Sequence, residues 1–274
     1  MTLVVARKQG NEVCIVADCL ISGGLSSRAP EYGLEILAIT PHVMVAYSGS
    51  PELAHRLVKE AMGESAYQTD RFLEALHTFR QRIGDAELDF IIIDKNEIAR
   101  LKDGLLDVNV SGAWIGNASA FGLFQSALHQ ADARLPIAAR MRGAMEIVCS
   151  SQEIETVGGP VIAAESTTIG TRYIGFMQLV SPYYVPHTDL NWQTVDFGTA
   201  ATGGFGFTTI VPPKPGLCGW GIFYLQGGAG FYFCVDLSTM RFEILKGYAA
   251  NVKDFCSLLE PEIGYLPVFV GQLG

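Results

Sequence analysis

Thr2 and Asp18 are the first residues whose types and spacing could do chemistry. The chain begins with Met1 and Thr2, and removal of Met1 would leave a free threonine at the head of a β-strand. An N-terminal threonine carries its hydroxyl beside its own α-amine, whose ordinary pKa of about 8 lets it accept the hydroxyl proton. A second β-rich run, Val13–Ala17, places Asp18 one short hairpin away. The alternative is an ordinary edge strand that keeps Met1, with Asp18 as a turn cap.

The cysteines and histidines suggest no other reactive site. Six cysteines are scattered through the chain without a CxxC pair, so we expect buried free thiols and neither a metal nor a cofactor. Cys14 is expected in the core, whereas Cys19, next to Asp18, is a weak alternative nucleophile without a nearby histidine. His55 and His77 lie on predicted helices beside polar residues and are expected at the surface.

Composition excludes several classes of function. The chain has 274 residues, a net charge of −9 and a pI near 5.0, which argues against nucleic-acid and anionic-membrane partners. Nearly half of the residues are apolar, so a large core is expected. No leader-like segment and no apolar run of about 20 residues is found, so we expect a cytoplasmic protein with no membrane partner.

Groups of strands alternate with pairs of helices over the first 165 residues. Ser50, Pro51 and Glu52 form a strong helix start, with serine as the N-cap and proline at the first helical position. The expected strands are Thr2–Arg7, Glu12–Asp18, Leu34–Ile39, Val43–Tyr47, Leu88–Ile93, Glu97–Leu101, Val108–Ile115 and Glu155–Ala164. The expected helices begin near Pro51, Asp70, Ala118 and Ile137. This order predicts a layered α+β sandwich with two sheets inside and helices outside.

The composition changes after about residue 160. The remaining residues hold 19 of the 28 aromatic residues and read as β-rich, with a hairpin formed by Gly219–Leu225 and Gly230–Leu237. A third strand is expected at Arg241–Lys246 and a final helix at Tyr248–Leu259. We therefore predict a core over 1–166 and a β-rich extension over 167–274, packed on the core or completing the same domain. Tyr183, Tyr184 and Trp192 are candidates for a substrate or subunit interface, or for buried loop packing.

Several local strings, taken in order, resemble the proteasome β-subunit family, including its HslV and Anbu branches. The strings are Thr2–Arg7, Val13–Asp18, Val43–Ser50, Ile91–Asp94 and Ala113–Ala118. The resemblance implies a four-layer αββα fold of the N-terminal nucleophile (Ntn) hydrolases, with the mature N-terminal threonine as a peptidase nucleophile. It also implies homo-oligomers, because members of the family stack as rings.

The resemblance assigns roles to individual residues. Thr2 matches the nucleophile, Asp18 matches the aspartate that orients the site, and Gly49 matches the glycine whose N–H donates to the oxyanion. Asn117 matches the family's supporting serine, and Ser119 lies two residues on. The family's later aspartate and serine have no clear counterpart, and the nearest candidates are Glu165 and Ser166.

One departure from the family pattern affects the chemistry. The family's catalytic lysine aligns with Leu34, next to the acidic Glu35, and no lysine occurs between Lys8 and Lys59. Arg28 is either a substitute source of positive charge or a solvated loop residue.

Two functions from different classes follow. The first is a threonine hydrolase that cleaves peptide or small amide bonds by acyl transfer through Thr2. The second is a non-catalytic proteasome-like scaffold or binding protein that lacks the activating lysine.

Overall fold

The computed structural model divides the chain into two units, Met1–Thr171 and Arg172–Gly274, each taken here by itself. It describes residues 2–21, 31–40, 42–65, 68–84, 87–159, 161–168, 170–174, 179–180, 194–196, 205–210, 217–224, 228–236 and 241–264. Met1, Arg28, Tyr183, Tyr184 and Trp192 lie outside these ranges. The division falls five residues after the sequence-based boundary at 166.

One antiparallel sheet of the first unit contains the chain start. Its strands lie in the order β10-β1-β2-β11. They are β1 (Leu3–Gln9), β2 (Glu12–Ala17), β10 (Gly112–Gly116) and β11 (Ile162–Ser166). The consecutive residues Val4 and Val5 are both buried, so this sheet is covered on both faces.

A second antiparallel sheet of the same unit has the order β5-β6-β7-β8-β9. Its strands are β5 (Ile36–Ala38), β6 (Val43–Gly49), β7 (Leu88–Asp94), β8 (Glu97–Lys102) and β9 (Leu105–Asp107). A short pair, β3 (Leu20–Ile21) and β4 (Glu31–Tyr32), leads into it. Strand β1 contacts β6 and β8, and β10 contacts β6, β7 and β8, so the two sheets pack face to face.

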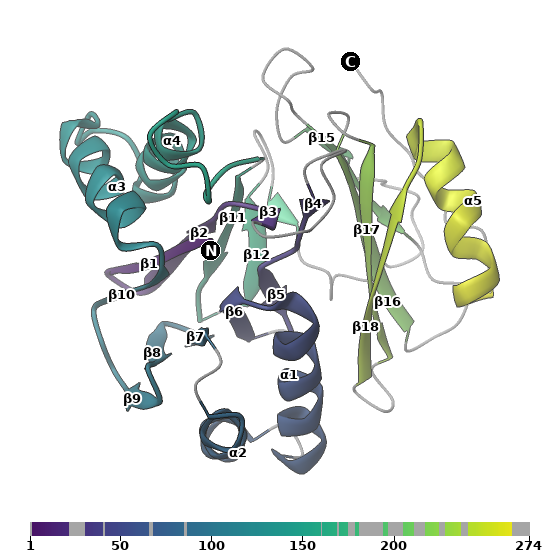
Figure 1. Cartoon of the computed structure of the whole chain (residues 1–274), viewed down its shortest axis with the longest axis horizontal. Helices are drawn as coiled ribbons and strands as arrows, with labels where there is room; N and C mark the ends of the chain where they lie inside the picture. Colours follow the sequence, from purple (N-terminus) through teal and green to yellow (C-terminus); the bar gives the residue numbers. More distant parts are fainter. Residues whose placement is uncertain are drawn as a thin grey trace. The chain divides into compact units, whose positions relative to one another are not determined.

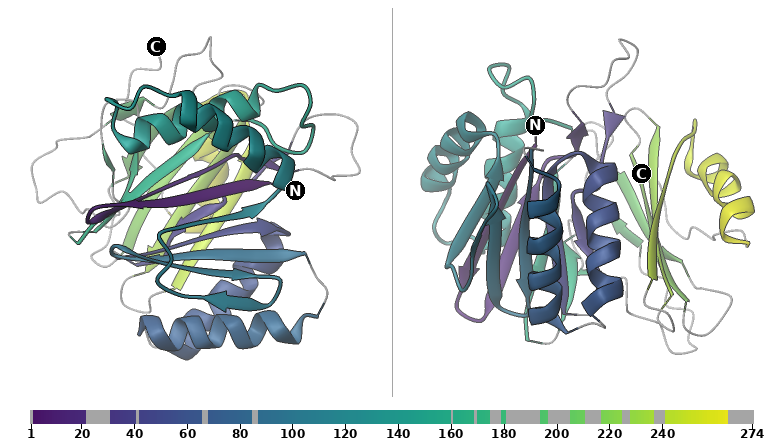
Figure 2. Two further views of the ribbon diagram at one scale, coloured as in Figure 1. Left: turned by 90° about the vertical axis from the view of Figure 1, so that its left-hand side faces the viewer. Right: turned by 60° about the horizontal axis from the view of Figure 1, so that its bottom comes forward.

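Four helices cover the outer faces of these two sheets (Figures 1 and 2). Helices α1 (Pro51–Ser65) and α2 (Thr69–Arg82) contact the second sheet. Helices α3 (Ala118–Gln130) and α4 (Ile137–Cys149) contact the first. Helix α1 starts where the sequence predicts, because the Ser50 hydroxyl accepts the Leu53 N–H at 3.3 Å.

The second unit contains a five-stranded antiparallel sheet in the order β14-β15-β16-β17-β18. The strands of this unit are β12 (Thr171–Ile174), β13 (Leu179–Val180), β14 (Thr194–Asp196), β15 (Phe205–Ile210), β16 (Leu217–Tyr224), β17 (Ala229–Asp236) and β18 (Arg241–Tyr248). Helix α5 (Val252–Ile263) packs Phe255 and Leu259 against Tyr232 of this sheet. The β16–β17 hairpin and the following strand are as predicted from the sequence.

The final helix begins four residues later than its predicted start at Tyr248. Tyr248 is the last residue of β18 and pairs with Ala229, and the N–H of Ala249 still donates to Gly228 O at 2.9 Å. Asn251 then caps the helix, because its side-chain oxygen accepts the Asp254 N–H at 3.0 Å.

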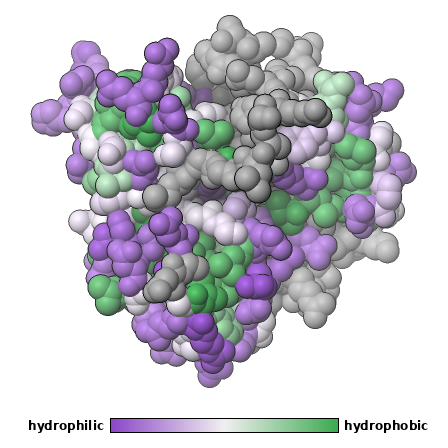
Figure 3. Space-filling model, viewed as in Figure 1, coloured by the Kyte–Doolittle hydropathy of each residue, from purple (hydrophilic) through white to green (hydrophobic). Residues whose placement is uncertain are grey.

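The described surface is mixed in polarity. The face of the molecule in Figure 3 is largely hydrophilic over the helices of the first unit, with smaller apolar groups between the polar side chains. Within the described residues, we find no helix that has both the length and the apolar character needed to cross a membrane.

Gly116 provides a test of how tightly the first sheet is packed. It has φ +93°, and a Cβ there would overlap the carbonyl oxygen of Thr2. We expect Gly116→Ala to lower the free energy of unfolding by about 2 kcal/mol or more, as measured by denaturant unfolding. The control is Gly122→Ala on α3, where a Cβ meets nothing within 4 Å. There we expect a gain of about 0.5–1 kcal/mol from helix propensity. Equal stability of the two variants would contradict this packing.

Candidate functional site

The Thr2 hydroxyl lies in a buried polar cluster at the start of β1. Thr2 is 3% exposed, and its Oγ1 donates a hydrogen bond to Asp18 Oδ1. Antiparallel pairing of Val4 with Ala17 brings the two residues together across the β1–β2 hairpin. The structure therefore places Thr2 and Asp18 in direct contact, as their spacing indicates.

Asp18 is fully buried and anchored by main-chain donors. Its carboxylate accepts the Leu3 N–H at 2.7 Å and the Gly158 N–H at 2.8 Å, in addition to the Thr2 hydroxyl. Burial nevertheless outweighs these hydrogen bonds and raises the pKa of Asp18 from 3.8 to about 6. The carboxyl therefore changes charge close to neutral pH.

Glu35, rather than Leu34, faces the Thr2 hydroxyl. The Glu35 carboxyl is hydrogen-bonded to the Thr2 side chain, although Glu35 is only 2% exposed. Leu34 is buried, and its carbonyl accepts the Tyr47 hydroxyl at 2.9 Å. The side chain that reaches Thr2 therefore belongs to the neighbour of Leu34, the residue with which the resemblance aligns the lysine. The side chains of neighbouring residues in an extended chain point in opposite directions. A shift of one residue in the alignment therefore changes which side chain is expected to face Thr2.

The environment of Glu35 favours its neutral form. Burial raises the pKa of its carboxyl well above the ordinary value, and the nearby charge of Asp18 raises it further. The hydrogen bond to Thr2 acts in the opposite direction and is the smaller effect. Oε2 of Glu35 is buried and has no hydrogen-bond partner among the described residues. The cluster thus combines an acid that ionises near pH 6 with one that holds its proton longer.

Tyr47 and His55 pack beneath this acidic pair. Their rings meet edge to face at 5.4 Å, and His55 also hydrogen-bonds to the main chain of Leu34. Burial lowers the pKa of His55 to about 4, with a smaller contribution from the charge of Lys59. The expected surface position of His55 is therefore wrong, because its ring packs against Tyr47. The pKa of the Tyr47 hydroxyl is raised by burial and then by the charge of Glu35.

Gly49 and Gly116 both line one pocket, and Gly116 also lies against the main chain of Thr2. Gly49 ends β6 with φ +116°, and a Cβ there would collide with the Glu87 carbonyl. Gly116 ends β10 against the Thr2 carbonyl, which also accepts the Asn117 N–H at 2.9 Å. Both positions require glycine for space as well as for backbone conformation.

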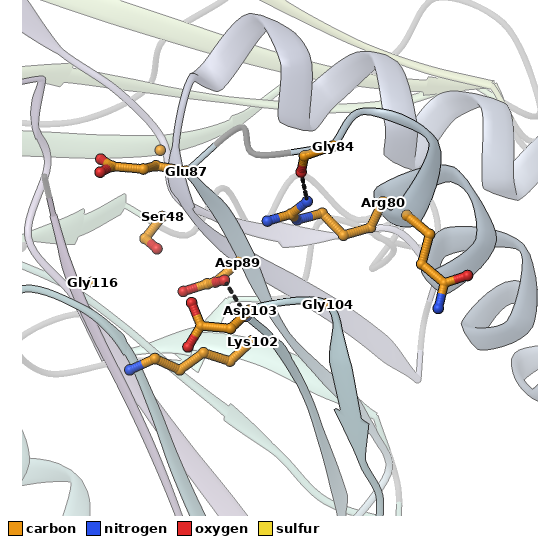
Figure 4. Close-up of a pocket in the computed structure, with 11 residues that line it drawn as sticks. Ser48, Arg80, Gly84, Glu87, Asp89, Lys102, Asp103, Gly104 and Gly116 are labelled. Atoms are coloured by element: carbon orange, nitrogen blue, oxygen red, sulfur yellow. Dashed lines mark hydrogen bonds between the residues drawn. The ribbon is translucent and has the colours of Figure 1, made fainter.

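A pocket of about 600 Å³ extends from these two glycines (Figure 4). Its lining carries charges of both signs, on Arg80, Glu87, Asp89, Lys102 and Asp103. Asp89 accepts the Asp103 N–H at 3.0 Å, and Arg80 donates to the carbonyls of Leu88 and Gly84. The ammonium of Lys102 lies 3.5 Å from the centre of the Trp114 ring. The pocket therefore suits a polar group better than an aliphatic one.

The side chain of Asn117 is used for structure. Its oxygen caps α3 by accepting the Ala120 N–H at 2.9 Å, and its nitrogen donates to Thr156 Oγ1 at 2.9 Å. Asn117 reaches Thr2 through its main-chain N–H instead. Ser119 lies exposed in the first turn of α3.

The loop after α4 supplies site contacts that the sequence did not single out. Gly158 donates to Asp18, and Thr156 holds Asn117. Glu165 and Ser166 pair with Cys14 and Val13, toward the opposite end of β2 from Asp18. They therefore do not complete the site, and Gly158-Gly159 after α4 was the available signal for the loop that does.

The thiols of Cys14 and Cys149 are not activated as nucleophiles. Burial raises the pKa of Cys14 to about 12 and also raises that of Cys149, to which the charge of Asp18 adds. Cys19 is fully buried. In the described parts of the chain, no three His, Cys, Asp or Glu residues lie close enough to hold a metal ion.

The raised pKa of Asp18 predicts how stability changes with pH. Because the folded state holds the proton more tightly, the stability that Asp18 contributes is present below about pH 3.8 and is lost as the pH rises to about 6. We expect wild type to lose on the order of 3 kcal/mol relative to Asp18→Asn over that window. Urea unfolding of both proteins at several pH values measures this, with exposed Asp70→Asn as the control. A constant difference between wild type and Asp18→Asn would contradict the prediction.

Comparison with known proteins reveals a likeness in fold. No family model matches the sequence, and no curated protein matches it significantly. Among solved structures, eukaryotic HslV from Trypanosoma brucei matches with a TM-score of 0.50 and 17% identity. The match covers 61% of this chain and 99% of the HslV chain. At this identity the likeness concerns architecture alone: the chain contains a mixed α/β fold of the HslV type.

Proposed function

We propose that this chain is a proteasome-like threonine hydrolase that cleaves peptide or small amide bonds by acyl transfer through Thr2. The observation that carries the proposal is the contact of the Thr2 hydroxyl with two buried carboxyls, next to a pocket that begins at Gly49 and Gly116. We assign the first unit to the four-layer αββα arrangement of such enzymes and the second to a β-rich extension. We also propose that the protein forms a homo-oligomer in the cytoplasm and uses no cofactor.

The nucleophilic step would use Thr2 Oγ1 and a main-chain oxyanion donor. Tyr47 donates its N–H to the Glu35 carbonyl at 3.1 Å, and alternate residues of a strand direct their N–H groups to the same side. Gly49 lies two residues after Tyr47 on β6, so its N–H is directed to the same side of the strand as that of Tyr47. β5 begins only at Ile36, so the Gly49 N–H faces the segment that precedes β5, near Glu35. Such a donor stabilises the negative charge that develops on the carbonyl oxygen. Water then releases the acyl group.

The pocket supports a substrate with a polar group. Lys102 is held on the face of Trp114 and Arg80 is held by carbonyls, whereas Glu87 and Asp103 are exposed. A substrate that carries both donors and acceptors can pair with this mixed lining.

A non-catalytic scaffold is the second candidate, and one observation favours it. Glu35, next to the position where the resemblance places a lysine, sets an acid against Thr2. An ammonium there would lower the proton affinity of the α-amine, whereas a carboxylate raises it. An enzyme built on Thr2 therefore needs a different route for the proton.

Intact-mass spectrometry with a threonine-directed β-lactone separates the two candidates. We expect Met1 to be absent and one covalent adduct to form, located on Thr2 by peptide mapping, because the hydroxyl is held between acids beside a pocket. Thr2→Ala should form no adduct, and Thr2→Ser should keep it because the hydroxyl is retained. A Met1-trimmed protein that forms no adduct would support the scaffold, and retention of Met1 would eliminate the N-terminal nucleophile.

A further inference from the structure

We propose that Asp18 and Glu35 act as a carboxyl pair that shares one proton and carries it through the acyl transfer at Thr2. This inference rests on the proposed function, because it describes how the same hydroxyl is activated. It replaces the α-amine with the pair as the proton carrier.

The contacts around Thr2 Oγ1 define the state of the pair. A hydroxyl has one proton to donate, and it donates that proton to Asp18 Oδ1. An ionised Glu35 would compete for that same proton, which is why the Thr2 contact favours the charged form of Glu35. Because the Thr2 proton goes to Asp18, we assign the protonated form to Glu35, and in that form it donates to Oγ1. The resting arrangement is therefore ionised Asp18, the Thr2 hydroxyl and protonated Glu35, in one continuous hydrogen-bonded chain.

The two carboxyls differ in how they are held. Asp18 accepts main-chain N–H groups of Leu3 and Gly158, which fix its position and favour its charge. Glu35 has no partner for Oε2 among the described residues, and it is almost fully buried. Two acids that share a site ionise one after the other. The main-chain donors lie on Asp18, so Asp18 is assigned the first negative charge. Asp18 is thus placed to accept a proton while Glu35 is placed to give one.

The acylation step balances with this single shared proton. Oγ1 bonds to the amide carbon while its proton passes to Asp18, and the carbonyl π electrons move to the oxygen. When the tetrahedral intermediate collapses, the C–N bond breaks and Glu35 gives its proton to the leaving nitrogen. The products are a neutral amine, the acyl ester on Thr2, protonated Asp18 and ionised Glu35.

Deacylation restores the resting state. Ionised Glu35 takes a proton from water while the water oxygen bonds to the ester carbon. The bond between that carbon and Thr2 Oγ1 then breaks. Asp18 returns its proton to Thr2 Oγ1. The sum is one amide plus one water giving one acid and one amine, and it consumes no external proton.

Other titratable groups near the pair stay neutral where the pair titrates. They are Tyr47 on β6, His55 on α1 and Cys149 at the end of α4. Raised pKa values keep Tyr47 and Cys149 protonated near neutral pH, and a lowered pKa keeps His55 uncharged. A nearby carboxylate raises the proton affinity of an α-amine, so the role of base is assigned to Asp18 and not to the amine exposed by removal of Met1.

The test is the pH dependence of Thr2 acylation by a β-lactone, followed by intact mass. For wild type we expect a bell-shaped profile, because the reaction needs Asp18 ionised and Glu35 protonated. Glu35→Gln keeps the size and the donor group but cannot transfer a proton. We expect it to slow acylation about 100-fold and to remove the alkaline limb of the profile. Exposed Glu97→Gln on β8 is the matched control and should leave the rate unchanged.

A second variant keeps the test decisive if Glu35→Gln unfolds. Glu35→Asp retains a proton donor but withdraws it from Oγ1, so it should slow acylation and keep both limbs of the profile. Wild-type rates and an unchanged profile in Glu35→Gln would overturn the shared-proton pair while leaving Thr2 as the nucleophile. If Glu35→Gln unfolds, loss of the alkaline limb in Glu35→Asp would overturn it in the same way. Absence of any adduct in Met1-trimmed wild type would overturn the proposed function and this inference together.

Discussion

Burial of the Asp18 carboxyl is the constraint on which the site depends. Its oxygens receive hydrogen bonds from Thr2 and Leu3 at the start of β1 and from Gly158 in the loop after α4. One carboxyl thereby joins the first strand, the end of the second strand and a loop 140 residues away. A buried charge is stable only with such partners, so the three segments are held in register by the requirement to satisfy it.

Burial of Asp18 also explains why the nearby acid Glu35 affects the chemistry of the site. Glu35 lies close enough to Asp18 for the charge of Asp18 to oppose the ionisation of Glu35, and the low-dielectric surroundings strengthen that opposition. In the proteasome-like pattern, a lysine near this position would relieve the repulsion. In the carboxyl pair proposed above, the relief comes from a proton kept on Glu35.

The space around the site is set by glycine. Gly49 and Gly116 end two strands that belong to different sheets, and each approaches a main-chain carbonyl too closely to carry a side chain. Both glycines line the same pocket, so both sheets contribute main chain to it. This charged pocket is otherwise lined by the ends of the second sheet and of α2.

The sequence by itself determined the order of elements and the pairing of Thr2 with Asp18. Alternating apolar residues, the Ser50 cap and the hairpin turn are local signals, and local signals set strands and helix starts. The hairpin then fixes which residues of β1 and β2 lie opposite each other. Only the tertiary structure decided that Glu35 faces Thr2 and Leu34 does not, that Asn117 caps α3, and that Gly158 completes the cluster. Each of these depends on the direction of a side chain or N–H across segments far apart in sequence, where a shift of one residue reverses the outcome.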